Sequence, residues 1–152
     1  MDAESIVRTY ADMIYKIAYR YMRTGADAED VFSEVWLTYF KKERRFDSEE
    51  HRKAWLIRVT INTAKGFLAK KTCTEELTDR MITDSPGADT EAQMDLREAI
   101  GRLRPEYREV ICLYYLQGLP VKTIGAILDR NENTVKIHLM RGREALRKYM
   151  GE

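Results

Sequence analysis

Apolar residues recur at intervals of three and four along the first 22 residues, and this spacing restricts the fold more than any other feature of the chain. Such a period places them on one side of an α-helix from about Ala3 to Met22. Strand-like alternation of useful length is missing from the sequence, and three prolines and eight glycines are too few for a turn-rich β-sandwich. The sequence therefore predicts an all-α protein. The apolar stripe of the first helix consists of Ile6, Tyr10, Ile14, Ile17 and Tyr21.

Apolar residues show helical spacing in two blocks of the chain, and a stretch without such spacing lies between the two blocks. In the first block, Gly25 is predicted to end the first helix, and a third helix is predicted from about Glu50 to Lys71. Between the blocks lies Ser85-Pro86-Gly87, which is typical of a turn or linker. We therefore expect two small helical domains, residues 1–73 and 93–152, joined by a flexible acidic linker over residues 74–92.

Charge is segregated along the chain, although the net charge is only +1. His51–Thr74 carries six basic residues and no acid, whereas Glu75–Asp95 carries seven acids and one arginine, a net charge of −6. From Leu96 onward the net charge is +4. This order favours two polyanion-binding units around an acidic connector, although charges that merely solvate helix faces would give the same pattern.

Residues 120–147 are predicted to form a helix-turn-helix. A short helix over Pro120–Leu128 precedes the turn Asp129-Arg130-Asn131, and Asn131 is a good N-cap for a longer helix from about Glu132. The longer helix has a polar and basic outer face, which suits the DNA major groove. An ordinary αα-hairpin with a solvated face would share these features. The outer face carries Asn133, Lys136, Ile137, Met140, Arg141, Glu144 and Arg147.

The third helix carries an aromatic and basic face opposite its apolar stripe. On that face Trp55 would stack on an exposed base, while basic side chains meet phosphates and Asn62 reads a base edge. Packing of Trp55 against the second helix is the simpler interpretation, but a neighbouring basic loop favours nucleic acid. The candidate residues are Trp55, Arg58, Asn62 and Lys65 on the helix, and Arg44 and Arg45 in the loop.

Other function classes find little support in the sequence. Cys73 and Cys112 are too few for a disulfide scaffold, and with only two histidines they give no zinc pattern. Because no nucleophile–base pair, metal cluster or phosphate-cradling glycine loop occurs, we expect a protein that is not an enzyme and needs no cofactor. Without an apolar run of about 18 residues or a signal peptide, it is expected to be soluble and cytoplasmic.

Three segments of the chain carry a likeness to a known family. They are DAEDVFSEVW (27–36), RRFDSEEHRKAWLIRVTINTAKGFL (44–68) and LRPEYREVICLYYLQGLP…IGAIL…NTVKIHLMRGREAL (103–146). In this order they resemble a bacterial sigma factor of the extracytoplasmic-function (ECF) group, over about residues 6–149. The resemblance implies that the first segment binds core RNA polymerase, the second melts and reads the −10 promoter element, and the third reads the −35 element.

The resemblance also implies roles for individual residues and partners. Core polymerase would be bound by exposed side chains near Asp30 and Glu34, and Asn62 with the loop before the third helix would capture a flipped-out −10 base. The linker would thread toward the active-site channel of the polymerase. The implied partners are core RNA polymerase, promoter DNA and an anti-sigma factor, often membrane-bound in this family, and the free protein would be a monomer. The implied polymerase contacts are Asp27, Asp30, Glu34 and Trp36, and the implied −35 contacts are Asn133, Lys136, Ile137, Met140 and Arg141.

The chain departs from the family pattern at three places. Ser33 replaces a usual glutamine, and Lys122-Thr123-Ile124-Gly125 replaces an acidic pair followed by Ile-Ala. Asp129-Arg130 replaces a glycine followed by an apolar residue. Because aspartate tolerates a left-handed backbone, the turn is expected to survive, and Arg130 is expected to keep its charged head in water.

Two other functions remain open at this point. A stand-alone helix-turn-helix regulator would bind a palindromic duplex tightly without polymerase. An anti-sigma-type protein or adaptor would bind polymerase or a sigma factor and never touch DNA, so alanine at Lys136 and Arg141 would leave its activity unchanged. An enzymatic function is the least favoured alternative.

Overall fold

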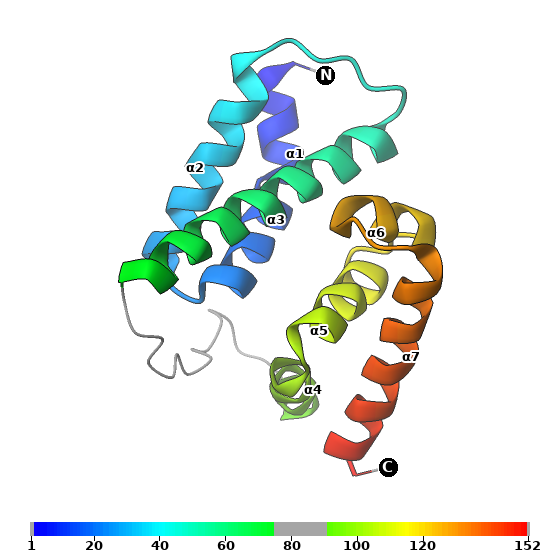
Figure 1. Ribbon diagram of the computed structural model, residues 1–152. Helices are drawn as coiled ribbons and strands as arrows, with labels where there is room; N and C mark the ends of the chain where they lie inside the picture. Colours follow the sequence, from blue (N-terminus) through cyan, green and yellow to red (C-terminus); the bar gives the residue numbers. More distant parts are fainter. Residues whose placement is uncertain (1, 75–90, 152) are drawn as a thin grey trace. The chain divides into compact units, whose positions relative to one another are not determined.

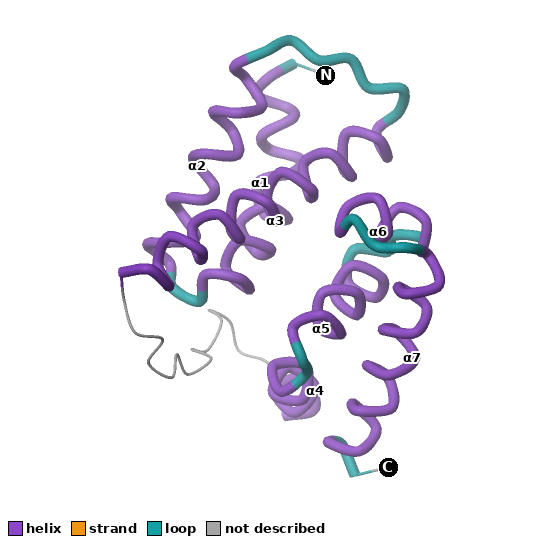
Figure 2. Tube along the Cα trace, in the orientation of Figure 1, coloured by secondary structure: helices purple, strands orange, loops and turns teal. Residues whose placement is uncertain are grey.

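The computed structural model describes residues 2–74 and 91–151, with the side chains of residues 2–70 and 96–151. The chain divides into two units, Met1–Thr83 and Asp84–Glu152. Every regular element in the described ranges is helical, as predicted, and no strand occurs there (Figure 2). None of these helices is both long and apolar enough to cross a membrane. Most of the predicted linker, residues 75–90, lies outside the described residues.

The first unit is built from three helices, each of which contacts the other two (Figure 1). They are α1 (Ala3–Met22), α2 (Gly25–Lys41) and α3 (Glu49–Thr74). The predicted stripe of α1 is buried except for Tyr21, which is only partly covered. The core of this unit includes Ile14, Ala18 and Met22 from α1, Ala28, Val31 and Val35 from α2, and Leu56 and Ala64 from α3.

The connection between α1 and α2 is shorter than predicted. Arg23, not Gly25, ends α1: it adopts the left-handed conformation with φ 67°, and its N–H donates to the carbonyl of Tyr19 at 2.7 Å. Thr24 then caps α2 by accepting the N–H of Asp27 at 3.3 Å, so Gly25 is the first residue of the second helix. The prediction that Gly25 ends the first helix was wrong because a side-chain cap follows the turn at once.

The second unit consists of α4 (Glu91–Arg102), α5 (Pro105–Ile111), the π-helix η1 (Cys112–Leu116), α6 (Val121–Leu128) and α7 (Glu132–Tyr149) (Figure 1). Pro105 opens α5, where a first-turn proline is tolerated, and the turn that follows α5 is wider, since the N–H of Gln117 donates to the carbonyl of Cys112 at 3.2 Å. A π-helical turn of this kind often marks a functional region.

Helix α7 packs against α4, α5 and α6. Val135, Leu139 and Gly142 face inward from α7. Gly142 allows α7 to approach α5 closely, because a Cβ atom there would lie 2.9 Å from Cγ1 of Ile111. Helical spacing predicts an inward stripe of Val135, Leu139, Gly142 and Leu146, and it is confirmed at the first three positions, whereas Leu146 is only partly covered. The outer face is therefore fixed by packing on the inner one.

Candidate nucleic-acid interface

The turn before α7 forms as predicted. Asp129 ends α6 in the left-handed conformation, with φ 56° and ψ 51°. Asn131 caps α7, because its side chain accepts the N–H of Asn133 at 2.7 Å. A short helix, a three-residue turn and an 18-residue helix therefore follow one another in helix-turn-helix order.

The outer face of α7 is exposed along its first three turns. Ile137 and Met140 are 44% and 47% exposed, and the cationic side chains of Lys136 and Arg141 lie beside them. Cations at this spacing suit guanine edges or phosphates, and apolar groups between them suit thymine methyls. The structure thus brings together on one exposed surface all the predicted −35 residues: Asn133, Lys136, Ile137, Met140 and Arg141.

The side chain of Arg130 is largely covered by protein, and the prediction that its charged head stays in water was wrong. Its guanidinium pairs with the Glu109 carboxylate, and the two side chains are 17% and 10% exposed. Nη1 also donates to the carbonyl of Glu106 at 2.9 Å and lies 3.4 Å from Nδ1 of His138. Burial, followed by the charge of Arg130, lowers the pKa of His138. Sequence reasoning missed this contact because Glu109 lies 21 residues away on another helix.

The predicted −10 residues on α3 fall into two groups. Arg58, Asn62 and Lys65 are exposed on the helix, and Arg45 is exposed in the preceding loop. Trp55 is half-buried, and the guanidinium carbon of Arg44 lies 4.4 Å from the centre of its ring. The other four candidates thus present polar or charged groups to solvent.

Trp55 packs against α2, which was the simpler of the two interpretations. Its ring centre lies 5.7 Å from that of Tyr39 and 5.9 Å from that of Phe46. Arg44 covers one face of the half-buried indole in this conformation, so stacking of Trp55 on a base through that face requires Arg44 to move away. Helical phase gave the correct side of α3, but the sequence did not show that the loop folds back over it.

The loop between α2 and α3 is held by contacts that the sequence did not reveal. Phe46 stacks parallel to Tyr39, with ring centres 6.3 Å apart, and contacts the His51 ring edge-on at 5.3 Å. The guanidinium carbon of Arg52 lies over the Phe46 ring, 5.1 Å from its centre. The backbone N–H of Asp47 donates to Nδ1 of His51 at 3.2 Å. The loop therefore has a defined shape beside the exposed part of α3.

The first turn of α3 is tied to α1 by a buried hydroxyl. Tyr10 is 7% exposed, and its hydroxyl donates to Oε2 of Glu49 at 2.6 Å. Burial and this hydrogen bond raise the pKa of Tyr10 to about 12. The same hydrogen bond lowers the pKa of the Glu49 carboxyl. Since Glu49 also pairs with Arg52, the contact links α1 to the residues that hold the loop.

The predicted polymerase contacts on α2 do not all lie on one surface. Asp30 and Glu34 are exposed and Asp27 is half-buried. Trp36, in contrast, is 8% exposed and belongs to the core, so its prediction as a direct polymerase contact was wrong. Its ring instead packs with Phe32, Tyr39 and Phe40, at centre-to-centre distances of 6.3, 5.6 and 5.8 Å.

Two large apolar residues near the end of α2 are exposed to solvent. Leu37 is 66% exposed and Phe40 is 49% exposed. Leu37 follows Asp30 and Glu34 at helical spacings of seven and three, so the three share one face. An acidic face with an apolar member is a better candidate protein-binding surface than the one that included Trp36.

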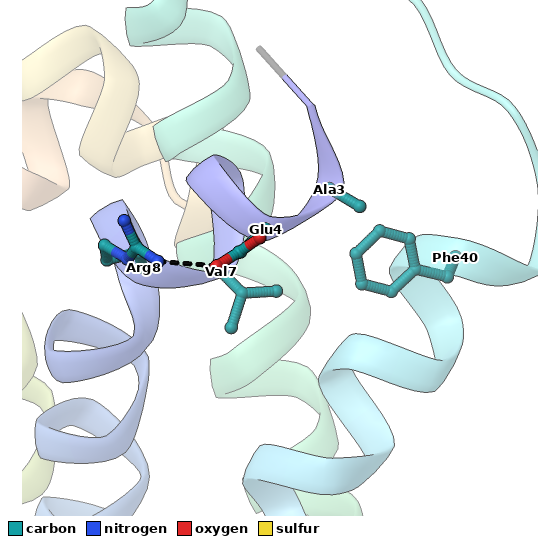
Figure 3. Close-up of a pocket in the computed structure, with 5 residues that line it drawn as sticks. All are labelled: Ala3, Glu4, Val7, Arg8 and Phe40. Carbon is teal, nitrogen blue, oxygen red and sulfur yellow. Dashed lines mark hydrogen bonds and ion pairs between the residues drawn. The ribbon is translucent and has the colours of Figure 1, made fainter.

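A shallow hollow of about 560 Å³ lies between the start of α1 and the end of α2 (Figure 3). It is lined by Ala3, Val7 and Phe40, together with Glu4 and Arg8, which pair with each other at 2.6 Å. The charged pair is exposed and lies at the edge of the hollow, so no polar group converges on a ligand. Over the ranges that the structure covers, no cluster of residues suits a metal ion.

Comparisons with known proteins match both units. Residues 6–73 match the family model described as Sigma-70 region 2, and residues 93–146 match that described as Sigma-70, region 4. The chain is 31% identical to the ECF RNA polymerase sigma factor SigW of Bacillus subtilis, covering 95% of this chain and 87% of the relative. It is 29% identical to the ECF RNA polymerase sigma factor SigE of Mycolicibacterium smegmatis, covering 98% of this chain but 62% of that protein.

A solved structure shows the same fold. The sigma factor RpoE from Bartonella quintana, in complex with the anti-sigma factor NepR, superimposes with a TM-score of 0.79 at 18% identity. The match covers 97% of this chain and 96% of that one.

Proposed function

The chain belongs to the ECF group of the sigma-70 family, and from this membership and the geometry above we propose which of its surfaces read promoter DNA and which bind polymerase. As a sigma factor it directs RNA polymerase to promoters and initiates transcription, and it is not an enzyme. Its two domains are residues 1–73 and 93–152, with residues 74–92 as the acidic linker that enters a basic channel of the polymerase.

The outer face of α7 is the −35 reader, and its exposed mixture of cations and apolar side chains is the observation that carries the proposal. Lys136 and Arg141 reach guanine edges or phosphates, and Ile137 and Met140 contact thymine methyls. Asn133 stands at the amino-terminal end, which enters the groove first in helix-turn-helix proteins. Because phosphate contacts release counterions, the affinity should fall steeply as salt is added.

The exposed part of α3 and the loop before it are the −10 reader. Arg45, Arg58 and Lys65 provide phosphate contacts, and Asn62 reads a base that has left the duplex. The aromatic contacts of Phe46 hold the loop in place before DNA arrives, which lowers the entropy cost of binding. In this arrangement Trp55 supports the surface from beneath and does not stack on DNA.

The exposed face of α2 binds core polymerase. Asp30 and Glu34 favour a basic partner surface, and Leu37 supplies an apolar anchor among them. A matched pair of substitutions separates this role from general stability. Leu37→Asp should abolish binding to core polymerase, whereas Lys16→Ala, at an exposed ion pair on α1, should leave it unchanged.

An anti-sigma factor is the proposed inhibitor of this chain. The RpoE structure of the same fold contains such a partner. We place the chain in the cytoplasm, where RNA polymerase works. We expect it to be a monomer when no partner is bound.

Run-off transcription tests the proposal as a whole. The chain is mixed with sigma-free core polymerase on fragmented bacterial genomic DNA, and the 5′ ends of the transcripts are sequenced. Discrete starts that share two upstream motifs would support it. Stable polymerase binding without any starts would favour the adaptor, and duplex binding without polymerase would favour the stand-alone regulator.

Single substitutions then test the −35 surface. Alanine at Lys136 or Arg141 should weaken use of promoters with the −35 motif by about 1–3 kcal/mol for each specific contact. Arg102→Ala is the matched control, because this arginine pairs with Glu98 on the exposed surface of α4 at 3.0 Å. Equal activity of all three variants would remove α7 from the mechanism.

A further inference from the structure

A largely buried ion pair, with side chains 17% and 10% exposed, connects the turn of the helix-turn-helix to α5. The Arg130 guanidinium reaches two acceptors one helical turn apart on α5, the Glu109 carboxylate through Nη2 and the Glu106 carbonyl through Nη1. Burying such a pair carries a desolvation cost, so charges placed here are weak candidates for added stability. The best-attested role of buried ion pairs is to favour one packing geometry over others of similar energy.

The backbone of Arg130 is held as firmly as its side chain. Its N–H donates to the carbonyl of Gly125 at 2.9 Å, and its own carbonyl oxygen would lie 2.6 Å from a Cβ atom at that position. On the other side of the turn, His138 stands 3.4 Å from Nη1 and its ring centre lies 5.6 Å from that of Tyr107 on α5. Arg130 thus contacts α5, the end of α6 and the second turn of α7 at once.

From this arrangement we propose that Arg130 is a positioning residue that sets the tilt of α7 and thereby the −35 sequence that the chain selects. The inference rests on the proposed role of α7 as the −35 reader. With a rise of about 1.5 Å per residue, Arg141 lies about 15 Å from Asn131, and a tilt of ~10° would displace it by about 2.6 Å. A displacement of that size exceeds the tolerance of a hydrogen bond to a base edge.

Arginine suits this role for a geometric reason. Its planar fork holds two acceptors in fixed directions, whereas an apolar side chain would fill the same space without fixing a direction. A lysine would neutralise Glu109 but would present a single point charge on a flexible stem. Leucine and lysine at position 130 therefore separate the effect of charge from the effect of direction.

The experiment compares promoter selection by four holoenzymes. Each consists of core polymerase with the wild-type chain, Arg130→Leu, Arg130→Lys or the control Arg102→Leu, which removes an exposed arginine from an ion pair in the same unit. The template is a library with a fixed −10 element and randomised −35 positions, and transcripts are counted by sequencing. Circular dichroism of each chain reports whether it is folded and at what temperature it unfolds.

The wild-type and Arg102→Leu holoenzymes should select one −35 motif with the same discrimination. Mismatch penalties at a well-read base pair are about 5- to 150-fold. In both Arg130 variants these penalties should fall below about fivefold, or the preferred motif should change. Arg130→Lys should show this change in −35 selection even though it keeps the positive charge. If Arg130→Leu does not fold, Arg130→Lys alone tests the inference.

Two results would overturn the inference in different ways. If folded Arg130 variants select the wild-type motif with the wild-type discrimination, Arg130 only stabilises the fold, whatever the change in unfolding temperature. If the wild-type holoenzyme selects no −35 motif, the assignment of α7 as the reader fails together with this one.

Discussion

Replacing Gly125 by alanine should destabilise the second unit, although alanine is the residue that the family pattern favours at this position. Gly125 lies in α6, one turn before the left-handed residue Asp129. A Cβ atom there would lie 2.6 Å from the backbone oxygen of Arg130. Carbon–oxygen contacts are about 3.3 Å even when favourable, so about 0.7 Å must open between them. That oxygen belongs to the turn, so it cannot move without shifting the start of α7.

The expected size follows from opposing contributions. Alanine is favoured over glycine by about 1 kcal/mol inside a helix. Overpacking typically costs about 1–3 kcal/mol, and weakening the hydrogen bond from the Arg130 N–H to the Gly125 carbonyl costs about 1 kcal/mol. The free energy of unfolding should therefore fall by about 1–3 kcal/mol. For a unit of this size each kcal/mol lowers the unfolding temperature by about 4–8 °C.

Calorimetry of the full chain measures this effect, with Gly66→Ala as the matched control. No atom lies within 4 Å of a Cβ built at Gly66, an exposed position in α3, so only the gain in helix propensity should remain there. We expect Gly66→Ala to raise the unfolding temperature and Gly125→Ala to lower it. Equal stabilisation by both substitutions would refute the steric reasoning and with it the tight turn.

Substitutions at three further positions test contacts elsewhere in the chain. Tyr10→Phe removes the hydrogen bond to Glu49 and should lower the free energy of unfolding by about 1 kcal/mol in urea titrations; an unchanged midpoint would contradict the tie between α1 and α3. Asn131→Ala removes the cap of α7 and should lower the free energy of unfolding by about 0.5–2 kcal/mol. Asn131→Gly should lower it by only a few tenths of a kcal/mol, so equal losses in the two variants would contradict the capping role. Burial lowers the pKa of His138 below 6.5, so its contribution to stability is complete above pH 6.5 and is lost as the pH falls through the lowered value. His138→Gln should therefore lose less stability between pH 7 and pH 5 than the wild type does, and parallel curves would exclude this contribution.

The helices and the outer face of α7 could be predicted because both depend on local periodicity. Spacings of three and four give the buried stripe of a helix, and the exposed face lies opposite to it. The side chains of Trp36, Trp55 and Arg130 could not be placed in this way. Trp36 and Trp55 lie on helices and Arg130 lies in a turn, and the burial of each depends on residues from another helix or on a loop that folds back. Sequence spacing within one helix contains no information on those neighbours.

For the same reason the polymerase-binding surface had to be revised. Trp36 and Leu37 are adjacent in α2, and both are large and apolar, so residue type alone does not tell which of the two is exposed. Successive side chains of a helix point about 100° apart, and here Trp36 points into the core while Leu37 points to solvent. The Asp129 turn and the Asn131 cap were predicted correctly because both depend on the preferences of single residues.

Because α7 approaches α5 closely, the side chains at positions 111 and 142 compete for the same space. A methyl group at Gly142 would meet Cγ1 and Cδ1 of Ile111 at 2.9 and 3.1 Å. Relatives with a larger residue at 142 should therefore have a smaller one at 111, and the two positions should vary together. In a library that changes one position at a time, each would look intolerant, whereas paired exchange would reveal sequences that keep the spacing between these helices.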